Sequence, residues 1–521
     1  MANPILALVG GTLIDGTGAP PLHNSVVLVE GGRISKVGRV EDVKVPRDAE
    51  VLDLTGKTVL PGFIDSHTHF LKMGVALRSM LDLSGARSLS QALELVEERV
   101  GLLEPGRWLV GYGWDESKWP EGRYLDKNDL DPLTPRNPVM LVRVCGHLAT
   151  VNTPALEAAG ITGETEPPEG GQVDRDEGGE PTGILRDCRQ LVEAHIPPPT
   201  PEELVAGIGE ASRLALSLGC TAIHDAGLGL QEAQAYLTAE EQGLLRVRAH
   251  LMWRVERPQE ALELARLVAS SKGLITSGPV KLLMDGSLGA HTAALFEPYE
   301  DDPDNRGLML MEPLELARRI KEAHQAGLQT ATHAIGDLAV ERVLDSIQEA
   351  LKAQPRRGHR HRIEHCELTS AQQIERINRL GVVPAMQPNF IGEWSGPGSM
   401  YRQRLGPRRE RMSNQYRAML DEGIRVAFGS DCMPFNPLYG VWSAVNHPIK
   451  PNRVSLEEAV MCYTLNSAYA AFTEDRLGSV EPGKLADIAV VDRDLTQVPA
   501  AEIREAKVVY TILGGEIAYS A

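Results

Sequence analysis

Eight short strand-like runs that alternate with helical patterns constrain the fold of this chain more than any other feature. Strands separated by helices form parallel sheets, because each crossover must return the chain to the same end of the sheet. Eight such units predict an α/β fold with a (β/α)8 barrel of the TIM type. The runs cover residues 59–64, 220–225, 247–253, 280–285, 329–333, 362–365, 382–387 and 425–431, and helical patterns at 203–218, 313–326 and 370–380 lie between them.

The two ends of the chain share a second pattern, in which β-like runs are split by turns. Such runs fill residues 5–53 and return in residues 487–519. Neither end has enough apolar residues for a core of its own, so we expect the two ends to pair. This reasoning predicts a small β-sandwich from residues 1–61 plus 478–521, attached to a barrel in residues 62–477.

Residues 71–200 do not follow the alternation of strands and helices. They contain strand-like runs at 108–112 and 139–144, and a Gly-, Glu- and Pro-rich stretch at 162–183 that we expect to be irregular. In barrels of this type the loops after the strands build the active site. We therefore expect an insertion after the first barrel strand that forms a lid or substrate wall, with a peripheral decoration as the alternative.

The balance of charge limits the partners of the protein. The 521 residues include 53 Lys and Arg against 71 Asp and Glu, and the net charge of −18 disfavours nucleic acid and anionic membranes. No run approaches the roughly 20 apolar residues of a membrane span. Residues 1–10 lack the basic region of a signal peptide and the six cysteines form no CxxC pair, so we expect a cytoplasmic protein. The expected partner is a small-molecule substrate, and a homodimer is left open.

Candidate metal ligands lie at the ends of several predicted strands. His67 and His69 follow the first run, and because extended chain places residues i and i+2 on one face, both imidazoles can bind one ion. Such a pair alone is also compatible with solvated surface. Three later runs end in His333, His365 and Asp431. Imidazole and carboxylate are ligands that zinc binds where thiolates are absent, so this set predicts a metal site at one rim of the barrel.

Lys281 lies inside the fourth run, between the apolar residues Val280 and Leu282. A lysine at such a position is unfavourable unless it is paired or modified. Burial lowers the pKa of a lysine and exposes the neutral amine, which can take up carbon dioxide to give a carbamate that bridges two cations. The alternative is a side chain that extends to the barrel end and remains solvated.

These motifs resemble the amidohydrolase superfamily, and the resemblance spans nearly the whole chain. It rests on Pro61-Gly-Phe-Ile-Asp-Ser-His-Thr-His69, Lys281, Thr332-His333-Ala, Glu364-His365-Cys and Gly429-Ser-Asp431. Three further segments are similar to the narrower amidohydrolase-3, YtcJ-like group, which includes N-substituted formamide deformylases. They are Gly113-Trp-Asp-Glu116, Asp285-Gly-Ser-Leu-Gly289 and Gly483-Lys-Leu-Ala-Asp-Ile488.

The resemblance implies a binuclear metal centre. The implied ligands are His67, His69 and Asp431 for one ion and His333 and His365 for the other, with carboxylated Lys281 as the bridge. We expect zinc, with manganese, iron or cobalt as alternatives. A hydroxide shared by the ions would attack a carbonyl, and Asp431 would pass its proton to the leaving amine.

Four residues outside this ligand set are candidates for contact with the substrate. Trp114, Asp115 and His147 lie in the insertion, and His291 follows the fourth run, where we expect arginine in many relatives. Each has an ordinary alternative as a packing or surface residue. His224 ends the second run, and we favour a structural role for it.

The expected function is that of a metal-dependent hydrolase, an amidohydrolase that cleaves an amide or other non-peptide C–N bond of a small molecule. A lactone or ester hydrolase on the same site is the alternative, because a barrel does not determine which bond is cleaved. A non-catalytic structural relative is a third interpretation, which the complete ligand set disfavours.

Overall fold

The computed structural model describes residues 5–168 and 171–521. The first four residues, on which the expected absence of a signal peptide partly rests, lie outside this range, as do two residues of the glycine-rich stretch. The chain forms two compact units: the barrel unit, residues 1–74 with 208–521, and the inserted unit, residues 75–207. The divisions fall within helices α1 (Phe70–Ser79) and α6 (Pro201–Ser217).

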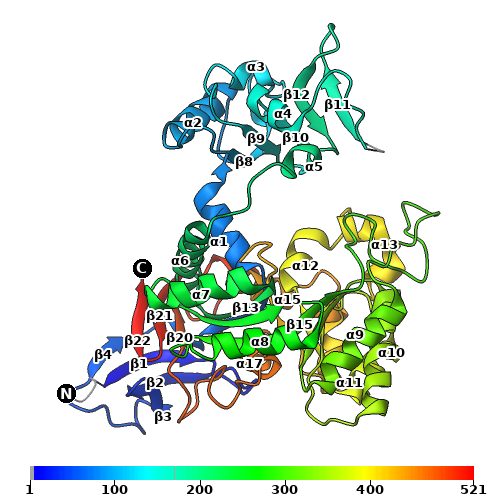
Figure 1. Ribbon diagram of the computed structural model, residues 1–521. Coiled ribbons are helices and arrows are strands. Elements are labelled where there is room, and N and C mark those ends of the chain that lie inside the picture. Colours follow the sequence, from blue (N-terminus) through cyan, green and yellow to red (C-terminus); the bar gives the residue numbers. More distant parts are fainter. Residues whose placement is uncertain (1–4, 169–170) are drawn as a thin grey trace. The chain divides into compact units, whose positions relative to one another are not determined.

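Eight parallel strands form the TIM-type barrel predicted from the sequence (Figure 1). They follow one another around the barrel in chain order. Backbone hydrogen bonding continues from the last strand to the first, since Asp431 N donates to His67 O at 2.8 Å. The strands are β6 (Phe63–Thr68), β13 (Cys220–Leu228), β14 (Arg248–Trp253), β15 (Ile275–Leu283), β16 (Thr330–Ala334), β17 (Arg362–His365), β18 (Val383–Met386) and β19 (Ala427–Phe428).

Gly429 permits the close approach between the ends of the barrel. A Cβ at this position would lie 2.5 Å from the backbone nitrogen of His67 and 2.9 Å from Asp65 Oδ1. Any side chain would therefore push the segment after β19 away from β6. The absence of a side chain at Gly429 thus helps to bring Asp431 next to His67.

The first barrel strand begins later than the sequence pattern predicts. The pattern suggests one strand from 59 to 64, but the structure contains two, β5 (Thr58–Pro61) and β6 (Phe63–Thr68). Between them the backbone changes partners, because Gly62 N donates to Asp487 O and Phe63 N donates to Gly219 O. As a result, β5 belongs to the sheet of the chain ends and His67 lies inside the barrel strand.

Helices cover the outside of the barrel strands (Figure 1). In α10 the buried positions include Val340, Val343, Leu344 and Ile347, the spacing of an amphipathic helix that packs one face inward. The helices of this unit are α7 (Leu230–Glu241), α8 (Pro258–Val268), α9 (Pro313–Gln325), α10 (Asp337–Ala353), α11 (Ala371–Leu380), α12 (Pro388–Trp394), α13 (Met400–Glu410), α14 (Tyr416–Asp421), α15 (Pro437–Val445), α16 (Leu456–Tyr463) and α17 (Leu465–Ala470).

Strands from both chain ends pair in one eight-stranded sheet. The junction is the antiparallel pair β5–β20, in which Thr58 lies opposite Val491 and Pro61 opposite Ile488. Leu8 and Val27 from the first end share an apolar cluster with Ile512 from the second. Besides β5, the strands are β1 (Leu6–Leu13), β2 (Leu22–Glu30), β3 (Arg33–Arg39), β4 (Glu50–Asp53), β20 (Ile488–Val491), β21 (Val508–Leu513) and β22 (Glu516–Ser520).

The inserted unit has a six-stranded sheet of its own, in the order β11-β12-β10-β9-β8-β7. Its elements are β7 (Leu81–Asp82), α2 (Leu89–Gly101), β8 (Leu109–Trp114), α3 (Lys127–Leu130), β9 (Val139–Arg143), β10 (Leu148–Val151), α4 (Thr153–Ala159), β11 (Gln172–Arg175), β12 (Pro181–Arg186) and α5 (Gln190–Glu193). The prediction of an irregular stretch at 162–183 is wrong in part, because β11 and the start of β12 form an antiparallel hairpin there. Val173 is buried in an apolar cluster, and Gly178 and Gly179 lie in the turn between the two strands, where Gly179 N donates to Asp176 O.

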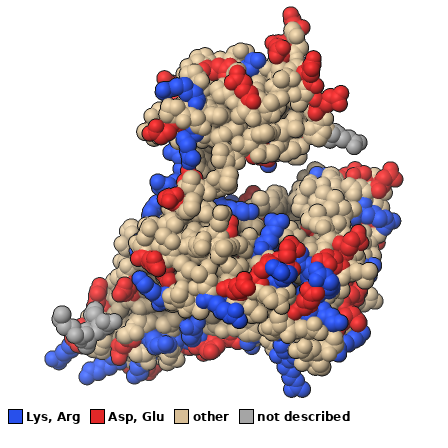
Figure 2. Space-filling view, in the orientation of Figure 1, with Lys and Arg blue, Asp and Glu red and all other residues tan. Residues whose placement is uncertain are grey.

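None of the helices in the described ranges is long and apolar enough to cross a membrane. On the face drawn in Figure 2, acidic and basic side chains are interspersed.

Candidate metal centre

Six predicted residues meet at the carboxyl end of the barrel strands. Because the strands are parallel, their carboxyl ends share one rim, and residues far apart in the chain become neighbours. The six residues, called the ligand cluster below, are His67 in β6, His69 directly after it, Lys281 in β15, His333 in β16, His365 at the end of β17 and Asp431 after β19.

The tightest part of the ligand cluster surrounds Asp431. Potential ligand atoms of His67, His69 and Asp431 all lie within 4.8 Å of one another. The Oδ1 atom of Asp431 is 3.4 Å from His69 Nε2 and 4.0 Å from His67 Nε2. Lys281 Nζ lies 3.4 Å from His67 Nε2, which places the amine beside the same group.

The other two histidines continue the ligand cluster from His67. The ring centroids of His67 and His365 are 4.9 Å apart, and those of His365 and His333 are 4.3 Å apart. His333 Nε2 donates to the carbonyl of Gly286 at 2.9 Å. This hydrogen bond leaves Nδ1 of His333 with a free lone pair, the form in which an imidazole can bind a cation.

Several polar atoms of the ligand cluster are buried without a partner. Among the described residues, Asp431 Oδ1, His69 Nδ1 and His365 Nδ1 have no hydrogen-bond partner. A buried polar atom left unpaired costs roughly 1–3 kcal/mol, so native structures rarely retain it without a reason. Nitrogen and carboxylate donors at this spacing fit one or more divalent cations.

Two residues of the ligand cluster have strained backbone conformations. His365 has φ 70° and Asp431 has φ 51°, both in the left-handed region that non-glycine residues rarely adopt. The cost of such a conformation is about 1–3 kcal/mol per residue, and such residues concentrate at functional sites. Here the strain occurs where two barrel strands end and their side chains join the cluster.

Burial makes the histidines of the ligand cluster neutral near pH 7. Desolvation lowers the pKa of His69 and of His333 to about 4, and holds the pKa of His67 and His365 well below the usual range. A neutral imidazole is the form that binds a metal ion. Burial also lowers the pKa of Lys281, which makes the amine form more accessible.

Sequence reasoning missed two charged residues below the ligand cluster. The carboxylate of Glu364 contacts His67 Nδ1, and Arg362 forms a bidentate ion pair with Glu364 at 2.8 and 2.9 Å. Their positions in the buried strand Arg362–His365 were a usable signal, because charges inside an apolar strand must be paired. Their further partners, Ser66, His67 and His224, could not be inferred, since they lie on other strands.

Trp114, Asp115 and His147, the three candidate substrate contacts of the insertion, differ in their surroundings. The side chain of Trp114 is fully buried in the core of the inserted unit, where the indole Nε1 donates to Leu141 O at 3.0 Å. Asp115 accepts hydrogen bonds from the backbone and side chain of Ser117, at 3.2 and 2.6 Å. His147 is exposed in the same unit, with Nδ1 2.7 Å from Asp187 Oδ1.

His291 and His224 both belong to the barrel unit. His291 lies on the loop after β15, with φ 54°, and its Nε2 is 3.1 Å from Asp301 Oδ1. Asp301 also pairs with Arg404 of α13, so this contact links the loops that follow β15 and β18. His224 is buried inside the barrel and contacts Arg362, consistent with a structural role.

Comparison with known proteins agrees with this geometry. Residues 50–519 match the model of the amidohydrolase family. The chain is 33% identical to the putative amidohydrolase YtcJ of Bacillus subtilis, over 95% of this chain and 96% of the relative. It is 29% identical to an N-substituted formamide deformylase of Arthrobacter pascens, over 95% and 94%.

A solved structure extends the match to three dimensions. An uncharacterized metal-dependent hydrolase from Pyrococcus furiosus is 31% identical, with a TM-score of 0.76 over 94% of this chain and 99% of that chain. The family model, the relatives and the barrel with its rim of histidines lead to one conclusion. The chain belongs to the amidohydrolase family, whose members of this type are metal-dependent hydrolases.

Proposed function

We propose that the protein hydrolyses an amide or other non-peptide C–N bond of a small molecule at the ligand cluster. The observation that carries the proposal is the convergence of four buried or half-buried histidines, Lys281 and Asp431 at one rim, with ligand-type atoms left unpartnered. The name of the deformylase from Arthrobacter pascens supports the choice of a C–N bond. We also propose a cytoplasmic location, with a homodimer as one assembly to test.

The proposed centre holds two divalent ions, with zinc first and manganese, iron or cobalt as alternatives. His67, His69 and Asp431 would hold one ion, and His333 and His365 the other. Bound divalent cations would supply an activated water and polarise the carbonyl to be attacked. Lys281 would serve as the bridge in its carbamate form, which its buried position and lowered pKa favour.

Asp431 has the second role of moving a proton. Its Oδ1 faces the two histidines of the first ion, and a carboxylate has a second oxygen, so one oxygen can bind the ion while the other accepts a proton from the attacking water. The carboxyl group can then donate that proton to the nitrogen of the leaving amine, which is a poor leaving group until it is protonated. Burial raises the pKa of Asp431, and a raised pKa suits a group that must both take and release a proton.

The test combines metal analysis with a substrate screen. Protein purified in bicarbonate buffer with added zinc or manganese should contain close to two divalent ions per chain. N-formyl, N-acyl and cyclic amides are then assayed beside lactones and simple esters. Turnover of amides supports the proposal, turnover of lactones or esters alone supports the alternative bond, and metal-free protein that is inactive on every class contradicts both.

A further inference from the structure

A buried ion pair lies directly below the ligand cluster. Arg362 and Glu364 are both in β17, and both side chains have an exposed fraction of 0%. Removing two charges from water is costly, and an apolar pair of similar size at such a position is often as stable or more stable. This pair therefore calls for an explanation other than stability of the fold.

One end of the pair contacts a predicted metal ligand. The Oε2 atom of Glu364 contacts His67 Nδ1, while the other ring nitrogen, Nε2, lies 3.4 Å from Lys281 Nζ. A carboxylate accepts hydrogen bonds only, so its contact places the hydrogen of His67 on Nδ1. The lone pair of Nε2 is then directed toward Lys281 and Asp431.

Arg362, the other member of the pair, binds the backbone of the residue that precedes His67. Arg362 Nη2 donates to the carbonyl of Ser66 at 2.6 Å, one residue before His67. Arg362 Nη1 lies 3.1 Å from His224 Nδ1, which accepts its hydrogen. Arg362 therefore connects β17 to β6 and to β13.

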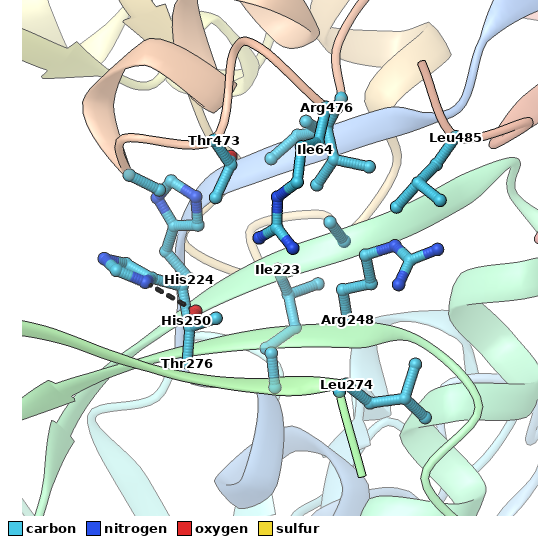
Figure 3. A pocket seen from close by; sticks show the side chains of 15 residues that line it. Ile64, Ile223, His224, Arg248, His250, Leu274, Thr276, Thr473, Arg476 and Leu485 are labelled. Carbon is cyan, nitrogen blue, oxygen red and sulfur yellow. Dashed lines mark hydrogen bonds between the residues drawn. The ribbon is translucent and has the colours of Figure 1, made fainter. Parts of the chain in front are cut away.

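The contacts continue to the amino end of the barrel. The rings of His224 and His250 are 5.0 Å apart, and His250 Nδ1 lies 2.9 Å from Thr276 Oγ1. Figure 3 shows both histidines at the wall of a small cavity of about 30 Å³ that Arg248 and Arg476 also line. A continuous polar column thus runs inside the barrel, from this cavity through Arg362 and Glu364 to His67.

We propose that Glu364 and Arg362 are positioning residues that set the tautomer and orientation of His67, and thereby the affinity of the ligand cluster for a divalent cation. The inference rests on the proposed function, because it requires that the cluster binds metal. Outer partners of metal-binding histidines commonly change metal affinity by about 10- to 100-fold when they are removed. Neither residue touches the substrate in this scheme.

The experiment measures cobalt binding, independently of turnover. Metal-free protein is titrated with Co²⁺ in bicarbonate buffer, followed by the visible absorption of the bound ion and by competition with a chelator, and melting temperatures are recorded. The variants are Glu364→Gln, which removes the carboxylate charge at constant size, and the double variant Arg362→Met with Glu364→Gln, which leaves no unpaired buried charge. The matched control is Glu474→Gln. It breaks the bidentate ion pair between Glu474 and Arg360, and Arg360 lies two residues before Arg362 in the chain.

We expect the single variant to bind Co²⁺ about 10- to 100-fold more weakly, with an altered absorption spectrum and a lower melting temperature. The double variant should recover most of the melting temperature, because no charge is left unpaired, while its affinity stays low. The control should lose some stability and keep the affinity and the spectrum of the wild type.

Two results overturn the inference while leaving the proposed function intact. One is wild-type affinity in both variants, and the other is a double variant that regains affinity together with stability, which would reduce the pair to a role in folding. If wild-type protein itself binds no Co²⁺, Zn²⁺ or Mn²⁺, the proposed function fails, and this inference fails with it.

Discussion

Two groups of histidines at opposite ends of the barrel differ in how their hydrogen bonds are satisfied. At the carboxyl end, the ligand cluster leaves His69 Nδ1, His365 Nδ1 and Asp431 Oδ1 unpartnered among the described residues. At the amino end lie His324, His359 and His361, called the base cluster here.

In the base cluster each ring nitrogen has a partner. His361 Nδ1 accepts from Thr330 N at 3.0 Å, so its hydrogen is on Nε2, which lies 2.8 Å from His324 Nδ1. His324 Nε2 then donates to Gln354 O at 2.7 Å. His359 Nδ1 accepts from His361 N, and its Nε2 contacts Leu380 O at 2.8 Å.

The comparison teaches that residue type alone does not separate a binding site from a structural group. Both clusters contain buried histidines and lie close to the ends of barrel strands. The clusters differ in how many of their polar side-chain atoms lack a hydrogen-bond partner. Among the described residues the ligand cluster has several such atoms, whereas every ring nitrogen of the base cluster is paired.

Lys281→Ala should abolish activity and remove most of the bound metal. The variant deletes the only candidate bridge of the proposed centre, so neither ion would keep its full set of ligands. Elemental analysis and turnover on a confirmed substrate measure the two effects, and short carboxylic acids should partly restore both. A variant that keeps its metal and its rate would show that Lys281 is no part of the centre.

Asp431→Asn should fold normally, retain some metal and lose at least about 100-fold in kcat. An amide keeps the size of the side chain and one coordinating oxygen but cannot accept the proton, and general acid–base catalysis contributes on this scale. Steady-state kinetics with matched metal content isolate the effect. Turnover close to that of the wild type would refute the proton transfer assigned to Asp431.

His361→Ala should have the opposite profile, with metal content and kcat unchanged and stability reduced. The substitution leaves Thr330 N and His324 Nδ1 without partners, and each buried unpaired group costs roughly 1–3 kcal/mol. Thermal unfolding of the variant beside the wild type measures the loss. Loss of metal in this variant would contradict the distinction between the two clusters.

The base cluster should also make the protein less stable in acid. Burial lowers the pKa of His359 and holds that of His361 well below its usual range. The nearby charge of Arg356, whose Nη1 donates to His324 O at 3.2 Å, acts in the same direction. The unfolded chain therefore binds protons first, so stability is full above about pH 6.5 and falls as the pH drops below it.

The loss should approach about 1.4 kcal/mol per pH unit for each histidine that stays neutral in the fold. Histidines of the ligand cluster titrate in the same direction, so the informative quantity is the difference between wild type and His361→Ala. We expect a shallower dependence of melting temperature on pH between 7 and 5 in the variant. Equal slopes would mean that His361 titrates normally in the folded protein.

His291→Ala and His147→Ala should have the smallest effects, since both residues lie outside the two clusters. Each side chain makes one contact with an aspartate, and loss of one hydrogen bond changes kcat/KM by about two- to tenfold. The ratio of kcat/KM between two substrates should change while the metal content stays constant. A change in neither variant would assign recognition to other residues, and loss of metal would mean that a ligand had been taken for a substrate contact.

The sequence predicts the barrel and the ligand cluster well, for physical reasons. Largely apolar runs such as 280–285 and 382–387 stand out because both faces of a parallel strand are buried. His333, His365 and Asp431 stand out because each follows such a run at a point where apolar residues would be expected to continue. Parallel strands then bring these ends together without further information from the sequence.

What the sequence could not predict depends on contacts between distant residues. Glu364 is adjacent to a recognised histidine, but its contact with His67 is formed only when β6 and β17 face each other across the barrel. The sequence around Trp114 would read the same whether the indole lined a pocket or filled a core. Only the packing of the folded chain places it in the core. The change of partner at Gly62 likewise depends on β20, near the other end of the chain.

The pairing of β5 with β20 has a consequence for how the protein is made. β5 continues through Gly62 into β6 and leaves the ribosome long before β20, its neighbour in the sheet. Until β20 has been made, the nascent chain therefore carries an apolar strand edge that has no partner, a state prone to aggregation. Chaperone demand should accordingly be highest for chains that stop just short of β20, even though every residue of the ligand cluster has by then been added.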